Sequence, residues 1–366
     1  MRLVSPKDEL AAKLAIASRA ASAKSTIQIL SHILLRADDG RCELAATDME
    51  LSLRVPLGGT VEQPGSVVLP RLAADIVRSM ADGPVTLEHR DNEGVVAVSG
   101  GGSAFSLNCL QAGDFPELPS DEGSGLSLPA DLLVDTVERV ARAASRDETR
   151  PVLTGVLLRL GPEGLTMVAT DSYRLAVRQA PLEAPPADTR EAIVPARALG
   201  EVARLAGVVK ADVVEIVLTE TQSLMRVGDF RLTSRLIEGQ FPDHRQLVPD
   251  SFEHDVAFGR AELLGVLGRI GVLAQRNTPV RLAFEPGSVT VSAVSDQVGE
   301  GRESLPVSFS GDPLEIGFNV EFLRAGVESV VGDEVRLGLI SPLRPGLLRG
   351  ADDDYRYLLM PIRLNA

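Results

Sequence analysis

The feature that most constrains the fold is an order of segments that occurs three times along the 366 residues. In each third of the chain, an amphipathic helical segment is followed by alternating strand-like runs, a shorter helical segment and further alternating runs. Pro6 and Pro129 stand at the opening turn of the first helical segment in the first two copies, where helices accept proline. The patterns predict helices over residues 6–22, 70–81, 129–146, 195–207, 260–276 and 319–331.

Short motifs repeat in the same order as the helical segments. Residues 45–51 (AATDMEL) correspond to residues 168–175 (VATDSYRL), and a weaker third copy covers residues 293–296 (AVSD). The aspartates of these stretches lie about 125 residues apart, and GDFP at 113–116 and GQFP at 239–242 close the first two copies. The agreement of several motifs in one order predicts three tandem domains, at residues 1–125, 126–252 and 253–366.

The content of each copy predicts its fold class. Two helices and many alternating strands favour an α+β domain in which both helices cover one face of an antiparallel sheet. Three such units can extend their sheets edge to edge into a curved array. We therefore expect helices on the inside and sheets on the outside of an arc or ring.

Composition is that of an ordinary globular protein, with 44% hydrophobic and 24% charged residues. The two cysteines, Cys42 and Cys109, form no metal-binding motif, and we expect both thiols to be reduced. No apolar run approaches the roughly 20 residues of a membrane span, and the first residues do not form a signal sequence. The expected location is the cytoplasm.

Enzymatic motifs are absent from the sequence. There is no phosphate-binding GxxxxGK[ST] loop and no GxSxG nucleophile motif, and the four histidines are scattered over different segments. Asp48 and Asp171 could be a catalytic carboxylate pair, but their equivalent positions in successive copies favour a shared role in a turn. We therefore expect no catalytic residues, no metal and no cofactor.

The net charge of −14 argues against a nucleic-acid partner until the charges are sorted by segment. The six helical segments carry 14 basic and 10 acidic residues, so the acidic excess lies outside them. Arginines at seven-residue spacing would share one face of an α-helix, two turns apart. Four segments contain such a pair, and Arg142 joins the second: Arg71 and Arg78, Arg139 and Arg146, Arg197 and Arg204, Arg269 and Arg276.

Two explanations of the arginine pairs compete. Arginine near the end of a helix complements the helix dipole, and a solvated basic face is common on surface helices. Four segments with the same spacing in an acidic chain favour a basic lining instead. Such a lining would attract phosphates loosely and without sequence preference.

Four stretches together resemble the beta subunit of bacterial DNA polymerase III, the beta sliding clamp. They are ATDSYRL at 169–175, GQFPD at 239–243, IGFN at 316–319 and YLLMPIRL at 357–364, and the likeness extends over the whole chain. The resemblance implies a DNA-bound processivity factor in which two three-domain subunits join head to tail as a closed ring. It also implies that Lys24, just after the first helical segment, faces DNA.

The resemblance implies a pocket between the second and third domains for short peptide motifs of the replicative polymerase, the clamp loader and repair proteins. Position 246 is Gln where many family members have a basic residue. Without the family, Leu175, Leu247 and Met360 would be read as core residues, although MPIRL is an unusually apolar chain end. The pocket positions implied here are Leu153, Thr170, Tyr173, Arg174, Leu175, Pro242, Leu247, Leu358, Met360, Pro361 and Ile362.

A homodimer interface between the first and third domains is also implied. The basic residue that often precedes the equivalent of Phe105 in this family is missing, because Ser103 and Ala104 occupy that stretch. We therefore expect the interface to depend more on apolar contacts. Its expected residues are Ile76, Met80, Phe105, Leu107, Val272, Leu273, Glu300 and Glu303.

Two other classes of function remain alternatives at this stage. A repeat-built peptide-binding scaffold that never contacts DNA would share the pocket but would not need the arginine pairs. A hydrolase would need a convergent polar cluster that the sequence does not contain. Native mass, followed by salt-dependent retention on circular and linear DNA, distinguishes these classes.

Overall fold

The computed structural model describes residues 1–22, 25–38, 41–120, 122–249, 251–274, 278–295, 297–351 and 354–364. Lys24, Arg276 and the third repeated aspartate, Asp296, lie outside the described residues. The chain divides into two compact units. One contains Met1–Ala130 and Arg204–Leu236, and the other contains Asp131–Ala203 and Ile237–Ala366.

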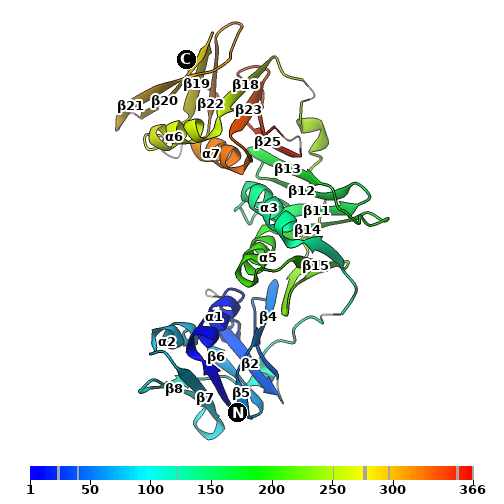
Figure 1. The fold of residues 1–366 in the computed structure, drawn as a ribbon, viewed down its shortest axis with the longest axis vertical. Helices are drawn as coiled ribbons and strands as arrows, with labels where there is room; N and C mark the ends of the chain where they lie inside the picture. Colours follow the sequence, from blue (N-terminus) through cyan, green and yellow to red (C-terminus); the bar gives the residue numbers. More distant parts are fainter. Residues whose placement is uncertain are drawn as a thin grey trace. The chain divides into compact units, whose positions relative to one another are not determined.

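The first unit contains two antiparallel sheets (Figure 1). The five-stranded sheet has the order β5-β1-β7-β8-β9, with β1 Arg2–Pro6, β5 Thr60–Gln63, β7 Pro84–Arg90, β8 Val95–Gly100 and β9 Ser103–Asn108. The eight-stranded sheet has the order β10-β15-β16-β17-β4-β3-β2-β6. Its strands are β2 His32–Asp38, β3 Arg41–Thr47, β4 Leu51–Leu57, β6 Gly65–Pro70, β10 Leu126–Pro129, β15 Val213–Leu218, β16 Gln222–Val227 and β17 Phe230–Arg235.

The second unit also contains two antiparallel sheets. The eight-stranded sheet, β14-β11-β12-β13-β25-β24-β23-β18, consists of β11 Gly155–Gly161, β12 Gly164–Thr170, β13 Arg174–Ala180, β14 Arg190–Pro195, β18 His254–Gly259, β23 Glu334–Leu339, β24 Gly346–Arg349 and β25 Tyr355–Leu359. The four-stranded sheet, β21-β20-β19-β22, consists of β19 Val280–Glu285, β20 Ser288–Ser295, β21 Gly299–Pro306 and β22 Leu314–Phe318.

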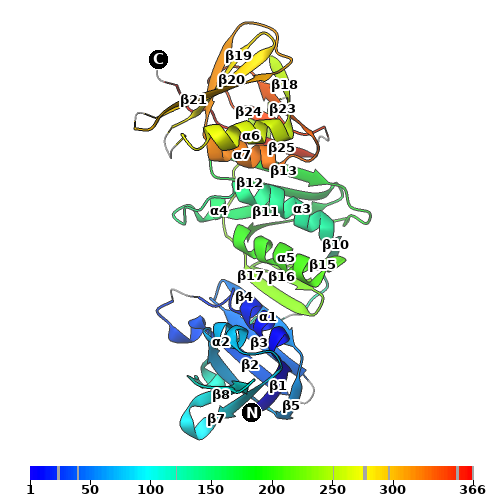
Figure 2. The ribbon, with the colours of Figure 1, turned by 60° about the vertical axis from the view of Figure 1, so that its left-hand side comes forward.

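The helices follow the predicted order, two for each third of the chain. They are α1 Lys7–Ala17, α2 Ala73–Ser79, α3 Ala130–Val140, α5 Ala196–Val209, α6 Arg260–Ile270 and α7 Val320–Ser329, with a single turn α4 at Pro151–Thr154. Short 3₁₀ turns cover η1 Gln28–Ser31, η2 Asp91–Glu93, η3 Ala112–Asp114, η4 Ala141–Ala143 and η5 Arg245–Leu247. Helices α1 and α2 pack together, as do α6 and α7 (Figure 2). The predicted fold class is confirmed.

Each eight-stranded sheet joins strands of two successive copies of the repeat, as expected for sheets that extend edge to edge. Strand β17 pairs with β4 in the first unit, and β13 pairs with β25 in the second. The core beneath the helices consists of buried Leu, Val and Ile side chains of the strands. Helix residues such as Leu10 and Leu14 of α1 are also buried in it. Burial alternates along β1 and β20, as the sequence pattern predicted, whereas the central strands β11 and β12 are buried almost throughout.

Several helices end earlier than predicted. Helix α3 ends at Val140 and passes through η4 into extended backbone at Ala144. Helix α6 ends at Ile270, where Gly271 follows as the C-cap. Beyond α3 the apolar spacing continued because Ala143 and Ala144 of the turn are also buried, whereas beyond α6 Val272 is 80% exposed. The periodicity therefore misplaced both helix ends and marked buried positions correctly only after α3.

Candidate binding sites

A tight turn between β12 and β13 is built around Asp171. The Asp171 carboxylate accepts hydrogen bonds from the backbone N–H groups of Tyr173 and Arg174 at 2.9 and 3.0 Å. Thr170 Oγ1 accepts one from the Ser172 N–H at 3.1 Å, and Ser172 has a positive φ of 79°. Asp48 accepts the same two backbone bonds in the first copy. The prediction that both aspartates serve a turn is confirmed.

The Arg174 side chain is held by groups of the protein itself. Its Nε donates to Asp171 at 3.0 Å, and its guanidinium lies 4.3 Å from the centre of the Phe322 ring. Its Nη1 donates to the Tyr357 hydroxyl at 3.4 Å. Burial raises the pKa of Tyr357 to about 12, so its phenol stays protonated and donates to the Phe322 carbonyl at 2.9 Å. Arg174 therefore presents a fixed rather than a mobile charge.

The chain end lies beside this turn because β25 pairs with β13. The Met360 N–H donates to the Tyr173 carbonyl at 2.9 Å, and the Ile362 N–H donates to the Gly317 carbonyl at 2.8 Å. Tyr173 is 62% exposed, Leu247 52% and Met360 43%. The structure therefore brings large exposed apolar side chains from three separate parts of the sequence into the second unit.

The remaining pocket residues have different surroundings. Leu153, Leu175 and Leu358 are buried, and the last two belong to a core cluster with Phe241 and Leu347. They are therefore core residues that a bound peptide could not contact as exposed anchors. Pro242 is exposed, and Thr170, Pro361 and Ile362 are half-buried. The Thr170 hydroxyl is already used within the turn, where it donates to the Arg174 carbonyl at 2.7 Å.

Two residues near this site were missed by the sequence analysis. Phe322 stacks on Arg174, and no local motif links a residue on α7 to a turn about 150 positions earlier in the chain. Arg245 is exposed on η5, directly before Gln246 and Leu247. The basic side chain that many family members have at position 246 is absent from this chain, but a basic side chain is present one residue earlier. Comparing adjacent positions would have found it.

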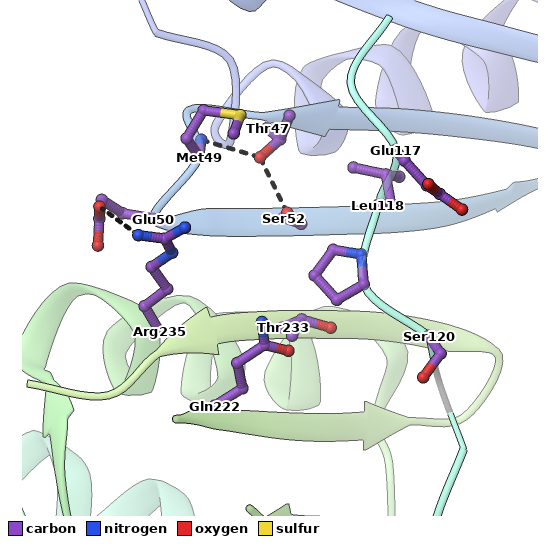
Figure 3. Close-up of a pocket in the computed structure, with 11 residues that line it drawn as sticks. Thr47, Met49, Glu50, Ser52, Glu117, Leu118, Ser120, Gln222, Thr233 and Arg235 are labelled. Atoms are coloured by element: carbon purple, nitrogen blue, oxygen red, sulfur yellow. Dashed lines mark hydrogen bonds and ion pairs between the residues drawn. The ribbon is translucent and has the colours of Figure 1, made fainter. Parts of the chain in front are cut away.

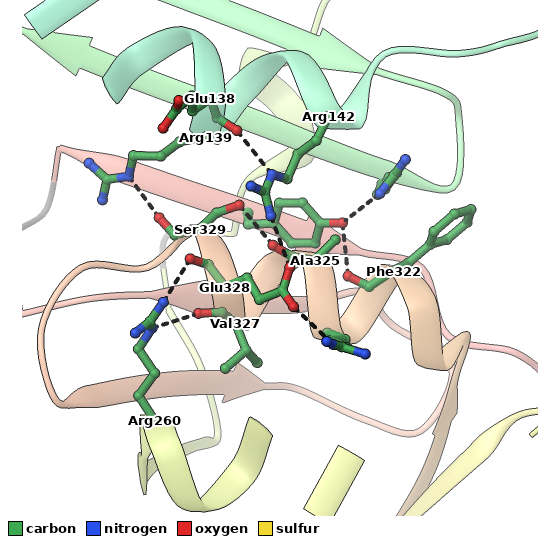
Figure 4. A network of polar contacts seen from close by, with 12 residues as sticks. Glu138, Arg139, Arg142, Arg260, Phe322, Ala325, Val327, Glu328 and Ser329 are labelled. Carbon is green, nitrogen blue, oxygen red and sulfur yellow. Dashed lines mark hydrogen bonds and ion pairs between the residues drawn. The ribbon is translucent and has the colours of Figure 1, made fainter. Parts of the chain in front are cut away.

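The arginines predicted to face DNA are not equivalent. Arg139 is 8% exposed, and its Nε donates to the Ser329 carbonyl at 2.7 Å (Figure 4). It also lies 4.7 Å from the centre of the Tyr355 ring. Arg142 pairs at 3.2 Å with Glu328, which lies on the same helix, α7, as Ser329. The assignment of Arg139 to a DNA-facing stripe was wrong, because its side chain packs against the end of α7 and the buried Tyr355 ring.

Two of the four pairs do not share a helix. Arg71 precedes α2, and Arg146 follows η4, so neither lies on the same helix as its partner; the fourth pair includes Arg276, which lies outside the described residues. Arg197 and Arg204 both lie on α5, where the spacing holds. Several of these residues are nonetheless exposed arginines, namely Arg71, Arg78, Arg142, Arg146, Arg197 and Arg269.

Ion pairs occupy part of this basic set. Arg78 pairs with Asp75 at 3.0 Å, and Arg269 makes two hydrogen bonds to Glu303, at 2.9 and 2.8 Å. The Arg269 hydrogen bond lowers the pKa of Glu303. A DNA-facing candidate and a dimer-interface candidate are thus neighbours in the third domain. Exposed pairs of this kind are weak and can open for another charged ligand.

The two strands expected at the dimer interface, β9 and β21, are both edge strands of their sheets. On β9, Phe105 is exposed, and Leu107 is half-buried. On the other side, Val272 is 80% exposed, and Leu273 packs against Gly301 of β21. Ile76 is half-buried and Glu300 exposed. Met80 is 5% exposed within its own unit, so its assignment to an intersubunit contact was wrong.

The described part of the chain contains no group of three or more histidine, cysteine or acidic side chains arranged to hold a metal ion. Within the same residues, every helix is too short or too polar to cross a lipid bilayer.

Comparisons with known proteins cover the whole chain. Sequence profiles of the DNA polymerase III beta subunit match residues 1–119 as its N-terminal domain, 127–243 as its central domain and 245–363 as its C-terminal domain. The beta sliding clamp of Synechococcus elongatus is 36% identical over 377 residues, and that of Streptomyces coelicolor is 33% identical over 380; each alignment covers both chains completely.

Solved structures give the same result. The DNA polymerase sliding clamp of Bacillus subtilis is 30% identical and superposes with a TM-score of 0.91 over all of both chains. The sliding clamp of Bartonella birtlesii, solved bound to griselimycin, is 29% identical with a TM-score of 0.92 over all of both chains.

Proposed function

Because this chain belongs to the family of bacterial DNA polymerase III beta subunits, the beta sliding clamps, we propose that two copies close a ring around duplex DNA. The protein is a DNA sliding clamp. The ring would hold the replicative polymerase on its template as a processivity factor without catalysing a reaction, in the cytoplasm. Three tandem domains, with boundaries at 125/126 and 252/253, would supply half of a ring of six.

The polar and apolar groups around β13 and β25 support a peptide-binding site for partner proteins. The pairing of β25 with β13 carries the proposal, because it joins exposed Tyr173 to Met360 beside a rigid, charged Arg174. Few large anchors on a fixed frame suit short motifs that must bind and exchange quickly. Polymerase, clamp-loader and repair proteins would each present such a motif, and Met360 can adapt to different side chains.

The exposed arginines support contact with duplex DNA. Arg71, Arg78, Arg146 and Arg197 are exposed at or near helices, while the chain as a whole carries a net charge of −14. Loose, sequence-independent attraction of phosphates needs only such positive side chains, and it weakens as salt increases. The acidic remainder of the protein would discourage DNA from binding elsewhere.

Removal of residues 362–366 tests the peptide site. The truncation deletes the hydrogen bond from Ile362 to Gly317 and part of the apolar surface. We expect the dimer to persist and most affinity for a Gln-Leu-x-Leu-Phe peptide to disappear, measured by fluorescence anisotropy. Unchanged affinity in the truncated dimer would place the partner site elsewhere.

A point variant repeats this test without shortening the chain. In Gly317→Ala the new Cβ would lie 2.6 Å from Leu364 Cδ2 and 3.0 Å from the Ile362 carbonyl oxygen. We expect the chain end to shift and peptide affinity to fall, with the fold intact. Gly200→Ala on α5 is the matched control, since its Cβ would meet nothing within 4 Å. Equal affinities in the two variants would contradict the proposal.

A further inference from the structure

A cavity of about 390 Å³ lies in the first unit, at the place where β4 and β17 meet. Figure 3 shows side chains from both strands, and from the segment Glu117–Ser120, around it. Its volume falls within the range of roughly 300–1,000 Å³ that is typical of small ligand sites. None of its lining residues belongs to the sites described above.

The backbone around this cavity repeats that of the proposed peptide site. Asp48 closes the same turn as Asp171, and Met49 and Ser172 have positive φ values of 76° and 79°. The Arg235 N–H donates to the Glu50 carbonyl at 2.9 Å. The Met360 N–H makes the equivalent bond to the Tyr173 carbonyl, also at 2.9 Å.

These equivalent hydrogen bonds and the strand registers show which residue of the cavity corresponds to which residue of the proposed peptide site. Ser52 pairs with Thr233 across β4 and β17, as Leu175 pairs with Leu358 across β13 and β25. Arg235 occupies the position equivalent to Met360 in the proposed peptide site, and Glu50 occupies the position equivalent to Tyr173. At these four positions, the apolar side chains of Tyr173, Leu175, Leu358 and Met360 are thus replaced by a hydroxyl or a charge.

The third wall of the cavity is fixed in place. Phe115 and Leu118 are buried in one cluster with Leu34, Ala45 and Val68, which holds the segment that contains Glu117. Arg54 Nη2 also donates to the carbonyl of Pro119 at 3.3 Å. A preformed cavity loses less conformational entropy on binding than one that must first be ordered.

The charges of the lining decide what kind of ligand fits. The lining contains two carboxylates, Glu50 and Glu117, and one guanidinium, Arg235. Glu50 and Arg235 are 4.0 Å apart and both are largely exposed, so their attraction is weak and solvent-screened. Glu117 has no ion-pair partner among the described residues. The lining therefore has a surplus negative charge and many hydroxyl and amide groups, which favours a polar, positively charged ligand.

We infer that this cavity is a second peptide site, which binds an extended polar segment through a lysine or arginine side chain. The apolar anchors of the motif for the first site would leave the Thr233 hydroxyl unpaired, whereas the Ser52 hydroxyl is already hydrogen-bonded to Thr47 Oγ1 at 2.9 Å. The two sites would therefore select different peptides on the same backbone frame. The equivalent turns and strand registers of the two sites motivate the inference, but peptide binding at each site can be measured separately.

Two of the six methionines are natural reporters, because Met49 lines the cavity and Met360 lies at the proposed peptide site. The intact protein, labelled with ¹³C at the methionine methyl groups, would be titrated with Ser-Gln-Lys-Ser-Arg-Ser. We expect the Met49 signal, assigned through Met49→Leu, to shift in a saturable way and the Met360 signal to stay. The charge-reversed peptide Ser-Gln-Glu-Ser-Glu-Ser should leave Met49 unshifted.

Two substitutions should change the affinity for the basic peptide in opposite directions. Glu117→Gln removes an attractive charge and should weaken binding about twofold to fivefold, the usual effect of one screened pair. Arg235→Met removes a repulsive charge and should strengthen it by a similar factor. Glu183→Gln, an exposed carboxylate in the other unit, is the matched control and should change nothing.

The inference is overturned if Met49 does not respond to the basic peptide, or responds equally to the acidic one. It is also overturned if Glu117→Gln and Glu183→Gln weaken binding equally, since that is the result of general attraction to an acidic surface. The Gln-Leu-x-Leu-Phe peptide should shift Met360 and spare Met49. Failure of that titration alone would count against the proposed function and not against the second site.

Discussion

Arg139 and Arg146 lie seven residues apart and have different surroundings. Arg139 donates to the Ser329 carbonyl, pairs with Asp135 at 3.5 Å and packs over Tyr355. Arg146 is exposed and has no ion-pair partner among the described residues. A buried charge with several partners stabilises the fold, whereas an exposed one is available for a ligand.

Substitution of Arg139 should therefore lower stability, whereas substitution of Arg146 should lower retention on DNA. Arg139→Met should lower the free energy of unfolding by about 1–3 kcal/mol, because it leaves the Ser329 carbonyl without its donor. Arg146→Glu should leave stability within about 0.5 kcal/mol and reduce retention on circular DNA at low salt. Urea denaturation and gel filtration with DNA measure the two effects. The reverse assignment of effects would show that Arg146, not Arg139, is the structural residue.

Asp171 and Asp48 provide a second comparison at this scale. Both accept two backbone bonds in their turns, but Asp171 also pairs with Arg174 at 3.0 Å, with both side chains nearly buried. Leu51 occupies the position equivalent to Arg174 in the first copy. Asp171→Asn should weaken binding of the Gln-Leu-x-Leu-Phe peptide, since the amide can still accept the two backbone bonds through Oδ1 but Arg174 loses its counter-charge and the acceptor for its Nε. Asp48→Asn should not, and calorimetric titration of both variants is the measurement.

At the scale of elements, the segment that precedes β10 is held by one carboxylate. Glu215 on β15 accepts hydrogen bonds from Arg226 and from the Gly125 N–H, each at 2.9 Å. Arg226 also donates to the Gly123 carbonyl. The Arg226 bond, followed by the Gly125 bond, lowers the pKa of Glu215. The segment is therefore tied to the sheet by a charge that depends on pH.

The sign of this dependence follows from the lowered pKa. A carboxyl group whose pKa is lower in the folded state stabilises the fold above its unfolded pKa of about 4.3 and loses that effect as pH falls through the folded value. Glu215→Gln should cost up to about 1 kcal/mol at pH 7, since the pair is partly solvent-exposed. The difference between variant and parent should shrink as pH falls below about 4.3 and vanish below the lowered folded pKa of Glu215. A difference that does not shrink as the pH is lowered would mean that the charge is not responsible.

At the scale of the whole molecule, β9 and β21 are unpaired edges that a second copy could cover. Exposed edge strands promote association, and three repeats provide half of a closed ring of six. Phe105 lies on β9, and Leu273 packs against β21. Strand β9 (SAFSLN) carries no charged side chain and β21 (GEGRESLP) carries three, so a pairing of the two would depend on backbone hydrogen bonds and apolar side chains rather than on ion pairs between the strands.

Assembly should respond to a single charge at either edge. Phe105→Asp or Leu273→Asp should shift a dimer toward monomer at micromolar concentration, because the carboxylate would be buried without a partner. Analytical ultracentrifugation gives the mass. Val208→Asp, at an exposed position on α5, is the control and should stay dimeric. A parent protein that is strictly monomeric would contradict the proposed ring.

The sequence alone determined the threefold repeat, the order of helices and strands in each copy, and the turn role of Asp48 and Asp171. These properties follow from local periodicity and from side chains that bond to their own backbone within three residues. Only the tertiary structure decided that Arg139 is buried against Ser329 and that Phe322 stacks on Arg174, because those contacts join residues more than 140 positions apart. It also decided that two equivalent turns open onto walls of opposite polarity, since cross-strand register, and not sequence distance, places Thr233 beside Ser52 and Leu358 beside Leu175.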